Sequence, residues 1–135
     1  MISKVDHIGI AVANLDETLR FYREILGLKV WKTETNAEQK VKVAFLPIGD
    51  TEFELLESTD PEGPIARFIK SKGEGIQHIA FRTDNIEKAL LHLKGNGIRL
   101  LNEKPHHGVG GSKILFLHPK SAYGVLVELV ERKAE

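Results

Sequence analysis

The sequence contains no cysteine, which excludes disulfide bonds, thiolate metal ligands and a cysteine nucleophile. It has no apolar run long enough to cross a membrane, and its first residues lack the apolar core of a signal peptide. Neither sign of charge is in excess, because Lys plus Arg and Asp plus Glu both total 19. No overall field therefore attracts nucleic acid or an anionic membrane. We expect a cytoplasmic protein without a nucleic-acid or membrane partner.

The main feature of the chain is an internal repeat. The stretch DHIGIAV is echoed by QHIAFRT, and FELLE is echoed by VELVE. His78 follows His7 by 71 residues, and Glu128 follows Glu54 by 74 residues. One His and one Glu therefore occupy matching places in each half of the chain.

We expect a single domain over residues 1–135, built from a repeat of residues 1–72 and 73–135, because each half is too small to bury its own faces. Both halves show a strand, a helix and three further strands. The expected strands cover residues 5–13, 28–34, 40–47, 51–58, 76–83, 98–103, 113–118 and 124–131. This order predicts an α+β fold of two tandem βαβββ modules with strongly curved, mostly antiparallel four-stranded sheets.

The two long helices are placed by caps and by a helical stripe. Asn14 and Glu17 suit a helix N-terminus, and Gly27 suits its end. Asp84 and Glu87 resemble the same cap in the second half. The apolar stripes consist of Leu15, Leu19, Tyr22 and Leu26 in the first helix, and of Ile86, Leu90 and Leu93 in the second. A third, short helix is expected over residues 65–71.

Alternation along the strands decides which side chains share a face. His7 shares a face with small residues, and Glu128 shares one with Leu126 and Val130. A buried carboxylate requires a cation, hydrogen bonds or a metal. If an approximate two-fold axis relates the halves, His7, Glu54, His78 and Glu128 converge. Such a group suits a divalent ion, with Co, Mn, Mg, Ni, Fe and Zn all open. The alternative is that duplication kept these residues for packing alone.

The doubled module, with His on its first and fifth strands and Glu on its fourth and eighth, resembles the vicinal oxygen chelate (glyoxalase/bleomycin resistance/dioxygenase) superfamily. Within it, four stretches resemble the methylmalonyl-CoA epimerase family. They are DHIGIAVANLDETLRFYREILGL, AEQKVKVAFLPIGDTEFELLE, GEGIQHIAFRTDNIEKAL and FLHPKSAYGVLVELVE. The match runs over nearly the whole chain.

The resemblance implies interconversion of (2R)- and (2S)-methylmalonyl-CoA, a reaction of propionate metabolism, in a metal-binding cavity. It implies one divalent ion per chain, with cobalt as the first choice, held by His7, Glu54, His78 and Glu128. Four protein ligands on a six-coordinate ion would leave two positions for the thioester and carboxylate oxygens of the substrate.

The resemblance also implies two proton carriers, because inversion requires one on each face of carbon 2. These are Glu128 and Glu38, with Glu34 as the alternative to Glu38. Lys120 and Ser121 are expected to contact the acyl-CoA substrate, and a homodimer is expected from the family.

Three other functions remain open within the same superfamily. They are lactoylglutathione lyase, an extradiol dioxygenase using two His and one Glu on iron, and a non-enzymatic small-molecule-binding module. The retained His7, Glu54, His78 and Glu128 weigh against the binding module, in which the ligand positions are lost.

Overall fold

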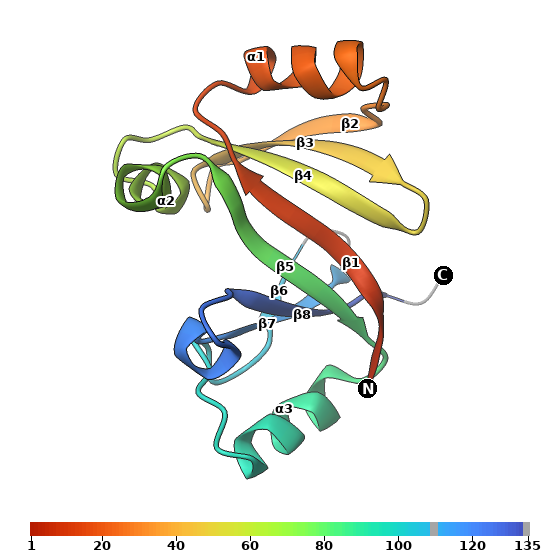
Figure 1. Cartoon of the computed structure of the whole chain (residues 1–135). Helices are drawn as coiled ribbons and strands as arrows, with labels where there is room; N and C mark the ends of the chain where they lie inside the picture. Colours follow the sequence, from red (N-terminus) through yellow and green to blue (C-terminus); the bar gives the residue numbers. More distant parts are fainter. Residues whose placement is uncertain (109–110, 134–135) are drawn as a thin grey trace. The chain divides into compact units, whose positions relative to one another are not determined.

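A computed structural model describes residues 1–108 and 111–133 of the chain (Figure 1). The first module contains β1 (Ile2–Ala11), α1 (Leu15–Leu19), the π-helical η1 (Arg20–Ile25), β2 (Lys32–Asn36), β3 (Val41–Ile48), β4 (Thr51–Ser58) and α2 (Pro64–Lys72). The second contains β5 (Gly75–Thr83), α3 (Ile86–Gly95), β6 (His106–His107), β7 (Lys113–Leu117), the 3₁₀ turn η3 (Pro119–Ala122) and β8 (Val127–Glu131).

The chain divides into two compact units. Unit one contains Met1–Asp6 and His78–Glu135, and unit two contains His7–Gln77. The strand order is β2-β3-β4-β1 in unit two and β5-β8-β7-β6 in unit one. In both, the first strand of the module pairs parallel with its last, and the other pairs are antiparallel. The predicted α+β fold with four strands in each module is confirmed, while the repeat boundaries stay a prediction.

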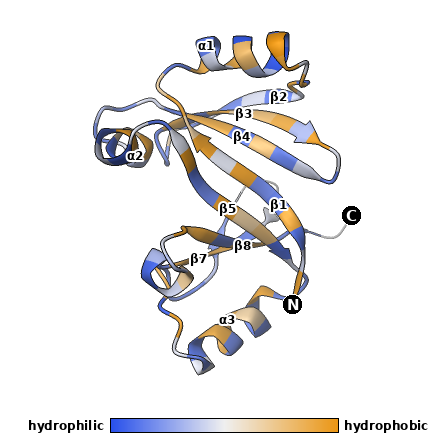
Figure 2. Cartoon of the chain, in the orientation of Figure 1, coloured by the Kyte–Doolittle hydropathy of each residue, from blue (hydrophilic) through white to orange (hydrophobic). Residues whose placement is uncertain are grey.

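The sheet of unit two is covered on both faces, each by a different helix. One face packs against α1, with a core of Ile10, Val12, Leu15, Leu19, Ala44, Leu46 and Leu55. Part of the other face packs against α2, with a core of Ala11, Val41, Val43, Phe45, Leu56 and Ile65. Consecutive residues of β3, such as Ala44, Phe45 and Leu46, are accordingly all buried, and orange, apolar stretches lie along these strands in Figure 2. The predicted faces of β1 are confirmed.

The first helix differs from the prediction in its last turn. The side chain of Asn14 accepts a hydrogen bond from the Glu17 N–H, as the cap pattern predicts. Beyond α1 the helix widens into η1, where the Leu26 N–H donates to the Phe21 carbonyl. This wider turn rotates Leu26 out of the apolar stripe, and its side chain is exposed. Leu28, from the following segment, packs against the core instead.

Two predicted strand positions are wrong. The second strand begins at Lys32 and not at residue 28. Leu28 and Val30, which precede it, pack against the core. Residues 98–103 contain only an isolated bridge from Leu100 to Leu117. The side chain of Asn102 accepts from the Phe116 N–H and donates to the Ile114 carbonyl, so it takes the place of a backbone partner there.

Unit one has its own core between α3 and the strands β5, β7 and β8. Its buried members are Ile86, Ala89, Leu93, Leu115, Leu117 and Leu129. The predicted stripe of α3 is therefore confirmed. The cap is Asn85 and not Asp84, because the Asn85 side chain accepts from the Lys88 N–H. Between α3 and β7, His106 and His107 form β6. Residues 109–110 lie outside the described part of the chain.

A carboxylate from the last strand of each module holds the helix of that module. Glu57 on β4 accepts from the Leu15 N–H at 2.6 Å, and Glu131 on β8 accepts from the Ile86 N–H at 2.9 Å. Each negative charge meets the positive end of a helix and satisfies an N–H group that has no partner within the helix. The repeat is therefore present in contacts as well as in strand order.

We expect Glu57→Ala to lower the free energy of unfolding by about 1–2 kcal/mol, because it removes a charge-assisted bond to a helix N-terminus. Urea denaturation followed by circular dichroism measures the change. Glu62→Ala is the matched control, since it removes an exposed carboxylate and should stay within about 0.5 kcal/mol of the parent. An equal midpoint for both variants would contradict this role of Glu57.

Candidate metal centre

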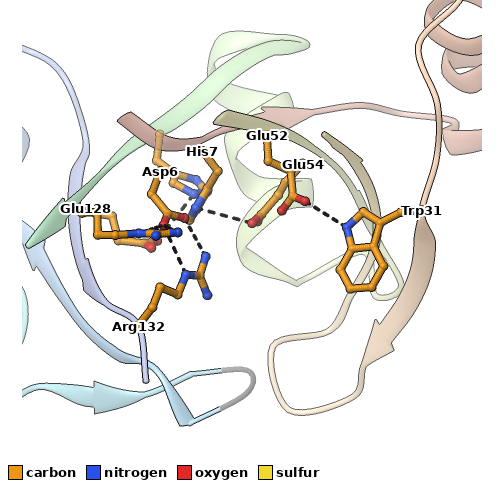
Figure 3. A network of polar contacts seen from close by, with 9 residues as sticks. Asp6, His7, Trp31, Glu52, Glu54, Glu128 and Arg132 are labelled. Carbon is orange, nitrogen blue, oxygen red and sulfur yellow. Dashed lines mark hydrogen bonds and ion pairs between the residues drawn. The ribbon is translucent and has the colours of Figure 1, made fainter. Parts of the chain in front are cut away.

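In unit two, His7 and Glu54 form a close pair. Strands β1 and β4 run parallel, with Gly9 opposite Glu54. His7 is buried, and its Nδ1 lies 3.5 Å from Oε2 of the largely buried Glu54 (Figure 3). Because Gly9 follows His7 on the same face, no side chain stands between the imidazole and the carboxylate.

In unit one, His78 and Glu128 form the equivalent pair. Strands β5 and β8 run parallel, with Ala80 opposite Glu128. Both side chains are buried, and Nε2 of His78 lies 3.5 Å from Oε1 of Glu128. In each unit, then, the Glu faces the small residue two positions after the His. The sequence predicted both pairs, and the structure brings each of them together.

The chain passes between the two units only twice, and each passage ends on one of these histidines. His7 is the first residue of unit two after Asp6, and His78 is the first residue of unit one after Gln77. Both histidines therefore stand where the covalent chain joins the units.

The side chains present are suited to a divalent metal ion. His7, Glu54 and His78 together offer two imidazole nitrogens and a carboxylate oxygen, a set of donors that could hold a metal ion. Within each pair the 3.5 Å separation is longer than a good hydrogen bond, yet short enough for both atoms to contact one ion. The burial of His7, His78 and Glu128 limits competition from water.

A charged cluster in unit one was missed by the sequence analysis. Asp6 is buried, and its carboxylate accepts from Arg82 at 2.8 and 2.9 Å and from Arg132 at 2.6 and 3.2 Å (Figure 3). Two guanidinium groups thus fix the residue that directly precedes His7. Alternation places Arg82 on the face of His78 and Arg132 on the face of Glu128, but it does not indicate that either arginine meets Asp6.

The two candidates for the second proton carrier have different surroundings. Glu38 is exposed in the turn between β2 and β3, and within the described residues its side chain forms no hydrogen bond or ion pair. Glu34 is half-buried on β2, and its carboxylate is paired with Lys32 Nζ at 2.6 Å. Lys32 in turn lies 4.4 Å from the ring centre of Trp31.

The predicted substrate contacts lie in the connection between β7 and β8. Lys120 is exposed, and its backbone N–H donates to Nδ1 of His118. The Ser121 hydroxyl oxygen accepts from the Arg99 N–H at 2.9 Å, so its hydrogen can be donated to a ligand. Partial burial lowers the pKa of His118, and the charges of Arg99 and Lys120 lower it further.

None of the helices described for residues 1–108 and 111–133 has the length and apolar character needed to cross a membrane.

Comparison with known proteins identifies relatives over almost the whole chain. The model of the Glyoxalase/Bleomycin resistance protein/Dioxygenase superfamily matches residues 4–129. The mitochondrial methylmalonyl-CoA epimerase of Homo sapiens is 40% identical over 129 residues, covering 95% of this chain and 73% of that protein. The ethylmalonyl-CoA/methylmalonyl-CoA epimerase of Cereibacter sphaeroides is 37% identical over 131 residues, covering 96% of this chain and 98% of that protein.

A solved structure of methylmalonyl-CoA epimerase in complex with methylmalonyl-CoA and NH4+ matches this fold with a TM-score of 0.92. The two sequences are 40% identical, and the match covers 99% of this chain and 97% of that chain. The family resemblance and the vicinal oxygen chelate fold that it implied are confirmed.

Proposed function

Because the chain belongs to the Glyoxalase/Bleomycin resistance protein/Dioxygenase superfamily and, within it, to the methylmalonyl-CoA epimerase family of enzymes, we propose that it interconverts (2R)- and (2S)-methylmalonyl-CoA. The observation that carries the proposal is the pair of equivalent contacts, His7 with Glu54 and His78 with Glu128. Each unit contributes one imidazole and one carboxylate, donor types that suit a divalent ion.

We propose that His7, Glu54, His78 and Glu128 hold one divalent ion per chain, with cobalt as the first ion to test. The donor types and their burial support this. A bound ion would supply Lewis-acid stabilisation of the negative charge that develops on the thioester and carboxylate oxygens.

Glu128 and Glu38 are proposed to move the proton at carbon 2, one from each face. One carboxylate removes the proton while the other, protonated, donates to the opposite face. The exposed carboxylate of Glu38 is available to a ligand, whereas that of Glu34 is occupied by Lys32. This contrast favours Glu38.

Lys120 and Ser121 are proposed to bind the acyl-CoA, through the ammonium group and the hydroxyl hydrogen respectively. The relative in Cereibacter sphaeroides is named for both ethylmalonyl-CoA and methylmalonyl-CoA, so both thioesters should be assayed. A cytoplasmic location and a homodimer stay proposals. Light scattering of the purified chain tests the dimer, and a monomer alone would refute it.

Proton exchange tests the proposed reaction. We expect (2R)- or (2S)-methylmalonyl-CoA in deuterated water to gain deuterium at carbon 2 and to reach an equal mixture of epimers, without net oxidation. Nuclear magnetic resonance and chiral analysis of the product measure both events. Hemithioacetal turnover would instead indicate lactoylglutathione lyase, and oxygen consumption with a catechol would indicate a dioxygenase. Unchanged substrate in every assay would favour a binding module.

A further inference from the structure

One cluster of ion pairs connects three segments of the chain, and each segment also carries a proposed metal ligand. The members of this arginine cluster are Asp6, Arg82 and Arg132. Asp6 directly precedes His7 on β1. One arginine lies on β5, four residues after His78, and the other lies just beyond the end of β8, four residues after Glu128. Residues four apart on a strand share a face, so each arginine stands on the face of the ligand that precedes it.

The carboxylate of Asp6 is held from two sides. Arg82 donates to Oδ2 from Nε at 2.9 Å and from Nη2 at 2.8 Å. Arg132 donates to Oδ1 from Nη2 at 2.6 Å and to Oδ2 from Nε at 3.2 Å (Figure 3). Two-nitrogen contacts of this kind fix an orientation as well as a distance. Asp6 is therefore fixed relative to both β5 and β8, within unit one.

The other module forms the same strands without such a cluster. The repeat offsets of 71 and 74 residues match Asp6, Arg82 and Arg132 with Gln77, Ala11 and Ser58. Ala11 is fully buried in the core that packs against α2. The Ser58 hydroxyl donates to the Asp60 carbonyl two residues away. The βαβββ module thus does not require ion pairs at these positions.

Stability alone does not account for the cluster. Withdrawing a charge from water costs several kcal/mol, and apolar residues of similar volume often stabilise a fold as well as a buried ion pair does. Here the carboxylate of Asp6 is 2% exposed, whereas the side chains of Arg82 and Arg132 are 37% and 35% exposed. The advantage of ionic groups over apolar ones is directional, because forked hydrogen bonds select one arrangement of the backbone.

We propose that Asp6, Arg82 and Arg132 are positioning residues of the metal centre. They fix the backbone next to three of the four proposed ligands and thereby set the affinity for a divalent ion. Groups that orient metal ligands without contacting the metal typically change its affinity ten- to hundredfold. The inference rests on the proposed function for the presence of the metal, and it does not depend on the substrate.

Calorimetric titration of the metal-free chain with Co²⁺ tests this role without a substrate. We expect Asp6→Asn and Arg132→Gln each to weaken Co²⁺ binding about ten- to hundredfold. The visible absorption spectrum of Co²⁺ bound at saturation should also change, because displaced ligands alter its coordination geometry. Arg20→Gln is the matched control, since it removes an arginine from an exposed pair with Glu24 and should bind Co²⁺ like the parent.

A neutral triple variant separates positioning from folding. It combines Asp6→Gln, Arg82→Ala and Arg132→Ser, the residue types of the other module, and removes all three charges of the cluster together. We expect its metal-free Tm to stay near that of the parent while its Co²⁺ affinity falls. If it does not fold, Arg132→Gln decides, since Asp6 keeps its bonds to Arg82 there. Parent affinity in the deciding variant, or lower affinity with an unchanged Co²⁺ spectrum, would overturn the inference.

The parent protein separates this inference from the proposed function. A parent that binds no Co²⁺ would refute the metal centre and the positioning role with it. A parent that binds Co²⁺, and whose variants all keep its affinity and spectrum, would overturn the positioning role alone. A parent whose Co²⁺ affinity depends on the cluster, but which does not epimerise methylmalonyl-CoA, would refute the proposed reaction and leave the positioning role standing.

Discussion

We expect His78→Ala to lose both its bound metal and its epimerase activity, the latter by about a thousandfold or more, since a catalytic metal supplies several kcal/mol of stabilisation. The variant removes one imidazole donor and leaves the carboxylate of Glu128 in place beside it. Elemental analysis after dialysis measures the metal, and an epimerase assay measures the activity. His92→Ala is the matched control, because that histidine is exposed on α3. Full metal occupancy in His78→Ala would contradict the assignment.

The same variant distinguishes one shared ion from two separate ions. Each unit already holds a His and Glu pair of its own, so the parent could bind one ion per chain or one per pair. If the four residues share an ion, the parent binds one equivalent, and His7→Ala and His78→Ala each abolish binding. Two equivalents in the parent, with one retained in either variant, would refute the shared centre.

The two pairs could be predicted because they depend on regularities that a sequence displays. Alternation along a strand assigns each residue to a face, and the repeat places His78 and Glu128 where His7 and Glu54 stand. The parallel pairing of the first and last strand of each module then brings His and Glu together. The same regularities predicted the Asn14 cap and the buried stripe of α3.

The features that were missed depend on contacts between distant or irregular segments. Asp6 meets Arg82 and Arg132 across 76 and 126 residues, and no local pattern reports such a separation. The apolar spacing of the first helix does not indicate the wider turn of η1 that exposes Leu26. In the expected strand over residues 98–103, the side-chain amide of Asn102 bonds to the backbone of β7 in place of a main-chain group. Strand propensity does not predict such a side-chain contact.

The arginine cluster also bears on the order of the proposed metal centre. A buried carboxylate is stable only with close partners, and two guanidinium groups supply them for Asp6. Since Asp6 directly precedes His7, the ion pairs of Asp6 restrain the backbone of β1 next to His7, where the chain passes from unit one to unit two.

The remaining large effect concerns the second proton carrier. We expect Glu38→Gln to keep its metal and to lose turnover by about a hundred- to ten-thousandfold, the usual contribution of a positioned acid or base. The substitution keeps the size of the side chain and removes its ability to accept and return a proton. Metal analysis and epimerase assays measure the two properties separately. Glu34→Gln is the matched control, since it changes a neighbouring carboxylate that is already paired with Lys32.

Deuterium exchange makes this prediction specific to one face of the substrate. In Glu38→Gln, the epimer whose proton faces Glu128 should still exchange that proton with deuterated water and retain its configuration. The other epimer should neither exchange nor invert, because its proton faces the side chain that no longer acts as a base. Parent turnover in Glu38→Gln together with loss in Glu34→Gln would assign the role to Glu34. Equal loss of exchange from both epimers would show instead that Glu38 acts on binding, since a single missing base leaves one face of carbon 2 reactive.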